Sequence, residues 1–205
     1  MLAVRLRLAY VDSGATYRAA ALKVRQAGLD PDDERAVAEL IGKTEIQFTP
    51  DGVEPRVLLD GKDVTKDLRT PEVTLAAARV SRLPEVREKL IKLQRSLACG
   101  RGVVMEGRDI GTVVFPEAPL KIFLKADPEE RARRRQEQDR KEGREATLEQ
   151  TAYEIGRRDQ LDAERRFSPL VAAPDAVEID STHLTADEVV ERILQLVRER
   201  KLEEV

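Results

Sequence analysis

The feature of this sequence that most constrains its fold is the alternation of short apolar runs with helix-forming segments. Four runs have the length and composition of buried strands: residues 8–11, 102–107 (GVVMEG), 120–126 (LKIFLKA) and 176–180 (AVEID). Helical sequence separates them. Strands that alternate with helices pair in parallel and are covered on both faces, so the chain is predicted to be an α/β protein.

Several helix boundaries can be predicted from local signals. Apolar residues at helical spacing run over 16–27 and stop at Gly28, and Asp30 with Pro31 predicts a second helix that continues to about Ile41. Further helix starts are expected at Pro71, Pro84 and Pro128, and after the capping boxes that begin at Thr147 and Thr185.

Residues 44–64 follow a different pattern. TEIQF, a Pro-Asp-Gly turn at 50–52 and RVLLDGKDV with a second Asp-Gly turn predict antiparallel hairpins. A chain of 205 residues has room for one α/β domain with such an insertion, so a single domain over 1–205 is expected.

Composition excludes several classes of protein. The net charge of −3 and the 3% of aromatic residues, with no Trp, argue against nucleic-acid and anionic-membrane partners. One Cys and one His leave no disulfide, no His-based metal site and no Ser–His nucleophile pair. Arg5 and Arg7 interrupt the apolar N-terminus, so no signal peptide is indicated and a cytosolic protein is the simplest interpretation.

Two clusters of polar residues follow predicted strands, where an open parallel sheet binds its ligands. In DSGATYR, Arg18 could bind a phosphate through two of its guanidinium nitrogens, or Ser13 could cap the helix while Arg18 stays on the surface. In EGRDIGTVVFP, Arg108 and Asp109 lie between glycines and apolar runs, which favours a ligand site over a structural ion pair.

Two further clusters lie on predicted helices. Arg158, Asp162 and Arg165 are spaced i, i+4 and i+7 on one face, where they could clamp a phosphate and a hydroxyl or form an ordinary salt-bridge ladder. The arginine-rich segment ERARRRQEQDRKEGRE could be a lid over a triphosphate, a plain surface helix or, against the acidic total, a nucleic-acid patch.

These motifs, together with RTPEV, LPEVREKL, LKIFL, DPEERARRR and the DST before the last helix, resemble bacterial cytidylate kinases in order along nearly the whole chain. The resemblance implies a nucleoside monophosphate kinase of the P-loop type, with a parallel sheet flanked by helices. It also implies an inserted substrate-binding subdomain at 42–82 and a lid at about 128–146. The implied reaction, in cytoplasmic pyrimidine nucleotide metabolism, moves the γ-phosphoryl of ATP to CMP or dCMP with Mg²⁺, and we expect a monomer.

The resemblance also implies residue roles. Arg18, Arg108 and Arg165 would hold the acceptor phosphate, Asp162 the ribose hydroxyl, and Arg87 and Asp109 the cytosine; Ser13, Tyr17 and Arg158 would complete the pocket. Phosphoryl transfer needs positioning and charge neutralisation more than covalent help, and arginines suit that task. The residues implied in transfer itself are Arg108, Arg158 and Arg165, and those of the lid are Arg131, Arg134 and Arg135.

Two departures from the family pattern stand out. Ala78 occupies a position where the family often has Ser, so cytosine selectivity is expected to be looser. The strand, the GxxxxGK[ST] phosphate loop and the helix that come first in the family, on the order of 25 residues, do not occur in the 205 residues. Gly42, Lys43 and Thr44 are the nearest match, but they follow a predicted helix instead of a strand.

Three hypotheses follow. A cytidylate kinase whose start lies upstream is favoured, because all acceptor-side residues are present. A non-catalytic CMP-binding or regulatory remnant, and a monophosphate kinase with a different base preference, are the alternatives. A polypeptide limited to these 205 residues is expected to have little or no kinase activity.

Overall fold

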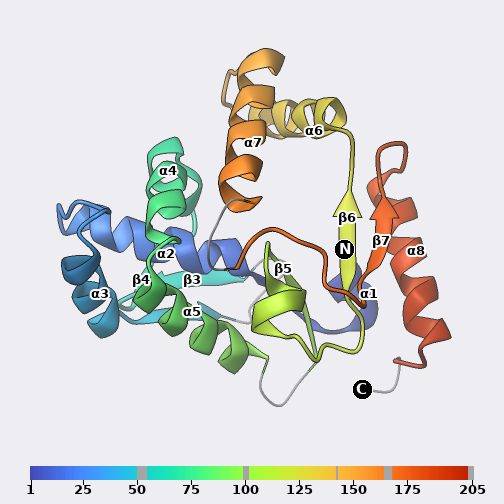
Figure 1. Cartoon of the computed structure of the whole chain (residues 1–205), viewed down its shortest axis with the longest axis horizontal. Helices are drawn as coiled ribbons and strands as arrows, with labels where there is room; N and C mark the ends of the chain where they lie inside the picture. The colour runs from blue at the N-terminus through green and yellow to red at the C-terminus, as the bar shows by residue number, and fades with distance from the viewer. Residues whose placement is uncertain (50–54, 99–101, 142, 164–167, 203–205) are drawn as a thin grey trace. The chain divides into compact units, whose positions relative to one another are not determined.

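The computed structural model of the chain describes residues 1–49, 55–98, 102–141, 143–163 and 168–202. It divides into two compact units, Met1–Ile110 and Gly111–Glu204. The elements of each unit are labelled in Figure 1. In the described ranges no helix is both long enough and apolar enough to span a bilayer.

A pair of parallel strands forms the first sheet of unit 1. Strands β1 (Ala9–Asp12) and β5 (Val103–Glu106) pair in parallel, with Asp12 opposite Glu106. The parallel pairing predicted from the apolar runs is confirmed. Both strands end in a carboxylate, so the carboxyl edge of this sheet is acidic.

The second sheet of unit 1 is the predicted antiparallel insertion. Strands β2 (Ile46–Thr49), β3 (Arg56–Leu59) and β4 (Lys62–Asp63) form it in that order. Asp60 and Gly61 both have positive φ, 48° and 79°, as a two-residue hairpin turn between β3 and β4 requires. The other predicted turn, at 50–52, lies outside the described residues.

The hydrophobic core of unit 1 is formed by residues of α2, α3, α4 and α5 with β2 and β3, and Figure 1 shows these four helices near one another. Ala19, Ala20 and Ala21 of α2 are completely buried, and their small side chains let α2 pack closely against α4. Gly28, at φ 66°, follows α2 as predicted. The helices are α1 (Leu2–Leu6), α2 (Ser13–Gln26), α3 (Glu34–Lys43), α4 (Pro71–Val80) and α5 (Pro84–Leu97), with a 3₁₀ turn η1 (Asp67–Arg69).

The start of α3 differs from the prediction. Asp33, not Asp30, caps the helix, because its carboxylate accepts a hydrogen bond from the Ala36 amide at 3.0 Å. Asp30 instead accepts from the Asp32 amide in a turn before the helix. Gly42 and Lys43 are the last residues of α3, so the GKT sequence lies at a helix C-terminus, where backbone amides do not converge on a phosphate.

Unit 2 contains the second parallel pair, β6 (Ile122–Lys125) with β7 (Val177–Asp180). A π-helical turn (η2, Ile110–Val114) precedes it in the chain. Both capping boxes predicted at the helix starts are formed, at Thr147 with Gln150 and at Thr185 with Glu188. The helices are α6 (Pro128–Lys141), α7 (Leu148–Ala163) and α8 (Ala186–Glu199).

The α/β class with parallel strands, flanking helices and a small antiparallel sheet is therefore confirmed. The predicted inserted subdomain at 42–82 falls within unit 1, and the predicted lid at 128–146 falls within unit 2. Their roles as a substrate-binding insert and a lid stay predictions.

Candidate functional site

The first part of the site is the turn from β1 into α2. Asp12 caps α2 by accepting from the Ala15 amide at 3.2 Å, and it also forms an ion pair with Arg18 at 2.5 Å. Ser13 is the first helical residue and not the cap. The side chain of Arg18 is only 17% exposed, and its Nε is buried without a hydrogen-bond partner among the described residues. The Arg18 side chain is thus fixed by its ion pair with Asp12 and is not freely solvated.

Two glycines allow close approach around this turn. A Cβ on Gly14 would lie 2.9 Å from a guanidinium nitrogen of Arg18, and a Cβ on Gly107 would lie 2.1 Å from Ser13 Oγ. The loop after β5 therefore passes directly against the start of α2. Side chains from both segments are brought to one place.

The second part of the site is a buried ion pair between Arg87 of α5 and Asp109 of the loop after β5. The residues are 5% and 6% exposed. A second nitrogen of Arg87 donates to the Ser81 carbonyl at 3.1 Å, and the guanidinium lies 5.5 Å from the ring centroid of Tyr17. A buried pair of this kind seldom adds net stability by itself. Its predicted role in binding cytosine stays a prediction.

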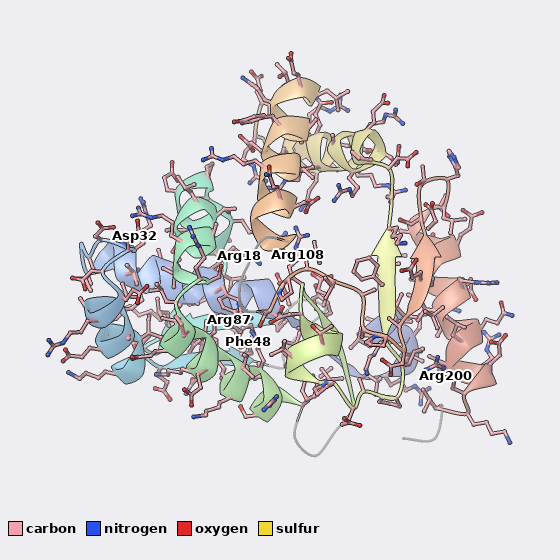
Figure 2. The ribbon with its side chains drawn as sticks, viewed as in Figure 1. Arg18, Asp32, Phe48, Arg87, Arg108 and Arg200 are labelled. Carbon is pink, nitrogen blue, oxygen red and sulfur yellow. The ribbon has the colours of Figure 1, made fainter. Side chains whose placement is uncertain are left out.

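Arg108 precedes Asp109 and is half-buried. In Figure 2 the labelled side chains of Arg18, Arg87 and Arg108 fall in the same part of unit 1, although they come from α2, α5 and the loop after β5. Arg18 is paired with Asp12 and Arg87 with Asp109. That these three arginines bind a phosphate-bearing ligand stays a prediction.

The acidic edge of the β1–β5 pair adjoins this turn. Tyr10 donates its hydroxyl proton to Glu106 at 2.7 Å, and burial together with the Glu106 carboxylate raises the pKa of Tyr10 well above its usual range. The sequence analysis did not include Asp12 and Glu106 among the candidate site residues, although both contact residues of this region. The available signal was that each is the last residue of an apolar strand.

The predicted clamp belongs to α7 of unit 2. Arg158 and Asp162 lie within this helix, so their spacing of four residues places them on one face. The structure does not describe their side chains, and Arg165 lies outside the described residues. The clamp therefore stays a prediction.

The three predicted lid arginines lie on α6, and each has a partner within unit 2. Arg131 pairs with Asp159 of α7, and Arg135 pairs with Asp139 at 3.2 Å. Arg134 donates to the Ser181 carbonyl at 2.6 Å, which ties α6 to the loop between β7 and α8. Whether any of them also contacts a nucleotide stays a prediction.

The described residues contain no group of three or more His, Cys, Asp or Glu side chains placed to hold a metal ion. This does not conflict with the Mg²⁺ that the resemblance implies. Mg²⁺ commonly keeps its waters and binds through substrate phosphates with one or two carboxylates.

Comparison with known proteins identifies the family. The family model described as cytidylate kinase matches residues 1–199. The chain is 48% identical over 200 residues to the cytidylate kinase of Geobacillus thermodenitrificans, covering 98% of this chain and 89% of that protein. It is 50% identical over 199 residues to that of Geobacillus kaustophilus, at 97% and 89% coverage. It is 45% identical over 196 residues to that of Caldicellulosiruptor bescii, at 96% and 87% coverage. The chain therefore belongs to the cytidylate kinase family.

Proposed function

We propose that this chain acts on CMP or dCMP as the phosphate acceptor, with ATP as the donor. The observation that carries the proposal is the buried Arg87–Asp109 pair, together with the Asp12–Arg18 pair at the start of α2. The family match over residues 1–199 supports a kinase in preference to a non-catalytic remnant.

The pair suits the recognition of cytosine. Cytosine presents an exocyclic amino donor next to ring and carbonyl acceptors. The Asp109 carboxylate can accept from the amino group, and Arg87 can donate to the acceptors. Uracil has a carbonyl in place of the amino group. The Asp109 carboxylate and this carbonyl are both hydrogen-bond acceptors, so they would repel each other. The pair therefore supports selectivity for cytosine.

The acceptor phosphate is assigned to the arginines. As the resemblance implies, Arg18, Arg108 and Arg165 would bind its oxygens, Asp162 would accept a ribose hydroxyl, and Arg158 would complete the pocket. An acceptor oxygen of CMP then attacks the γ-phosphorus of ATP in line, and the bond to ADP breaks. The arginines hold the two reactants and neutralise the phosphate charge.

Mg²⁺ would enter with the phosphates of ATP, and Asp12 and Glu106 are the carboxylates at the sheet edge whose hard oxygens suit it. When bound, the ion supplies charge neutralisation on the phosphates. The lid role of Arg131, Arg134 and Arg135, the cytoplasmic location and the monomeric state stay predictions.

The test of the acceptor site is calorimetry of CMP, UMP and cytidine binding to the wild type and to Asp109→Asn. The amide can present a donor where the carboxylate could only accept, so we expect CMP affinity to fall about tenfold or more and the preference for CMP over UMP to shrink. The matched control is Asp32→Asn, an exposed carboxylate paired with Arg79. Equal CMP affinity in wild type and Asp109→Asn would contradict the assignment of Asp109.

The donor side gives a separate expectation. The 205 residues contain no GxxxxGK[ST] sequence, so a polypeptide limited to them should bind CMP yet transfer phosphoryl groups very slowly. A coupled assay of ADP release would measure this. Turnover at about 1–100 per second, the usual range for kinases, would show that a segment other than a GxxxxGK[ST] loop binds ATP.

A further inference from the structure

A fully buried glutamine links α5 to the candidate site. Gln94 is 0% exposed, and its amide nitrogen donates to the Thr16 hydroxyl of α2 at 2.8 Å. Among the described residues, its amide oxygen is buried and accepts no hydrogen bond. The side chain is therefore only half satisfied in the interior.

Thr16 links Gln94 to the first turn of α2 through a second hydrogen bond. Its side chain is also 0% exposed, and its hydroxyl donates to the Ser13 carbonyl at 2.7 Å. The hydroxyl accepts from Gln94 and donates to Ser13, so the two hydrogen bonds run in one direction and strengthen each other. They end on the residue whose Oγ adjoins Gly107.

The same face of α5 contacts α2 at a second position. Arg87 and Gln94 are seven residues apart, which is close to two helical turns, so they project from one side of α5. Arg87 lies over the ring of Tyr17, and Gln94 bonds to the adjacent Thr16. The first turn of α2 is thus held to the helix that carries Arg87.

Stability alone does not explain a glutamine at this position. The neighbouring buried residues of α5 include Val86 and Leu90, and an apolar side chain in place of Gln94 would bury no unsatisfied oxygen. A group that costs stability in a core, yet is bonded to a turn with binding residues, is typical of a site that trades stability for function.

We propose that Gln94 is a positioning residue for the acceptor site: through Thr16 it holds the first turn of α2, with Ser13 and Arg18, in register with Arg87 and Asp109. The inference rests on the proposed function of that site. Gln94 acts through its hydrogen bond to Thr16 and not through contact with a ligand.

The test compares Gln94→Met, Thr16→Val and Thr16→Ser with the wild type. Methionine keeps the length of glutamine, valine keeps the shape of threonine, and serine keeps the hydroxyl. Calorimetry gives the affinities for CMP and for cytidine, and urea unfolding gives the stability of each protein. Leu90→Val is the matched control, because it trims the same face of α5 without removing a polar contact.

Gln94→Met and Thr16→Val are expected to bind CMP about 3- to 10-fold more weakly, the effect of one hydrogen bond. The affinity for cytidine should fall less, because cytidine has no phosphate and Arg18, which the first turn of α2 positions, is proposed to bind the phosphate. Gln94→Met should unfold at the same or a higher urea concentration than the wild type. Thr16→Ser should bind CMP like the wild type, and the double variant Gln94→Met with Thr16→Val should be no weaker than either single variant.

Leu90→Val is expected to unfold earlier while its folded form binds CMP normally. Unchanged CMP affinity in both Gln94→Met and Thr16→Val would overturn the positioning role, and so would losses of affinity that simply follow losses of stability across all four variants. Neither result would affect the proposed function, which fails only if the wild type does not bind CMP.

Discussion

At the scale of single residues, the site depends on glycines that let two loops meet. Gly107→Ala would place a Cβ 2.1 Å from Ser13 Oγ and 2.8 Å from Ile110 Cδ1. The loop after β5 must then move away from α2. We expect a stability loss of about 1–3 kcal/mol in urea unfolding, typical of overpacking, and weaker CMP binding.

Gly42→Ala is the control for that substitution. Gly42 lies in α3, and a Cβ there would meet nothing within 4 Å. It should stabilise unit 1 by about 0.5–1 kcal/mol, because alanine is the better helix former. Equal effects of the two substitutions would show that the close approach at Gly107 is unimportant.

The buried Arg87–Asp109 pair gives a second prediction. Arg87→Met removes the Arg87 counter-charge from a buried carboxylate, which should cost about 3–5 kcal/mol in the free energy of unfolding. Adding Asp109→Leu removes the carboxylate and should restore most of the stability while CMP binding stays lost. If Arg87→Met unfolds at the same urea concentration as the wild type, the pair is not buried as described.

The sequence indicates several residues of the candidate site but does not show all the side chains with which they form ion pairs or hydrogen bonds. The resemblance pointed to Arg87 and Asp109 together. The sequence does not decide between a phosphate ligand and a surface residue for Arg18, because a local pattern does not reveal its ion pair with Asp12 at the end of β1. Gln94 gave no signal, since a glutamine in an amphipathic helix ordinarily faces solvent.

At the scale of elements, the start of α8 gives a pH-dependent prediction. The Thr185 amide and hydroxyl both donate to the Glu188 carboxylate and lower its pKa below the ordinary 4.5. A carboxylate with a lowered pKa in the folded state contributes stability above its unfolded pKa and loses it as the pH falls through the folded value.

The cap contribution should therefore be full at neutral pH and fade below about pH 4.5. Glu188→Gln should be less stable than the wild type at pH 7, and the difference should shrink as the solution is acidified toward pH 3. Urea unfolding at several pH values measures it. A difference independent of pH would show that the charge of Glu188 is not involved.

Local signals explain which elements were predicted well. The helix start at Pro71 and the two capping boxes were predicted correctly, because each is marked by a contact within one helical turn. The start of α3 was wrong because Asp30 and Asp32 are engaged by Arg79 of α4, a partner that a local pattern does not contain.

At the scale of the whole molecule, hydrogen exchange can show which parts respond to CMP. The proposed function predicts slower exchange in the first turn of α2 and in the loop after β5, and also in the last turns of α7, where Arg158 and Asp162 lie. Protection confined to unit 1 would remove the α7 residues from the pocket. The amides of α8 serve as an internal reference, because no proposed contact lies there.

The sequence predicted the parallel direction of the strands but not the way they are distributed. The described parallel strands pair as β1 with β5 in unit 1 and as β6 with β7 in unit 2. Pairing partners far apart in the chain are set by tertiary packing, which periodicity does not encode.

The contact between Arg87 and Tyr17 also gives the molecule its own optical reporter. The chain has no tryptophan and three tyrosines, so tyrosine emission is not masked. Tyr153 is 68% exposed and Tyr10 is bonded to Glu106, whereas Tyr17 lies beneath the Arg87 guanidinium. A ligand that binds to this cation changes the surroundings of Tyr17, so occupancy of the site can be followed in the unlabelled protein by its ultraviolet fluorescence.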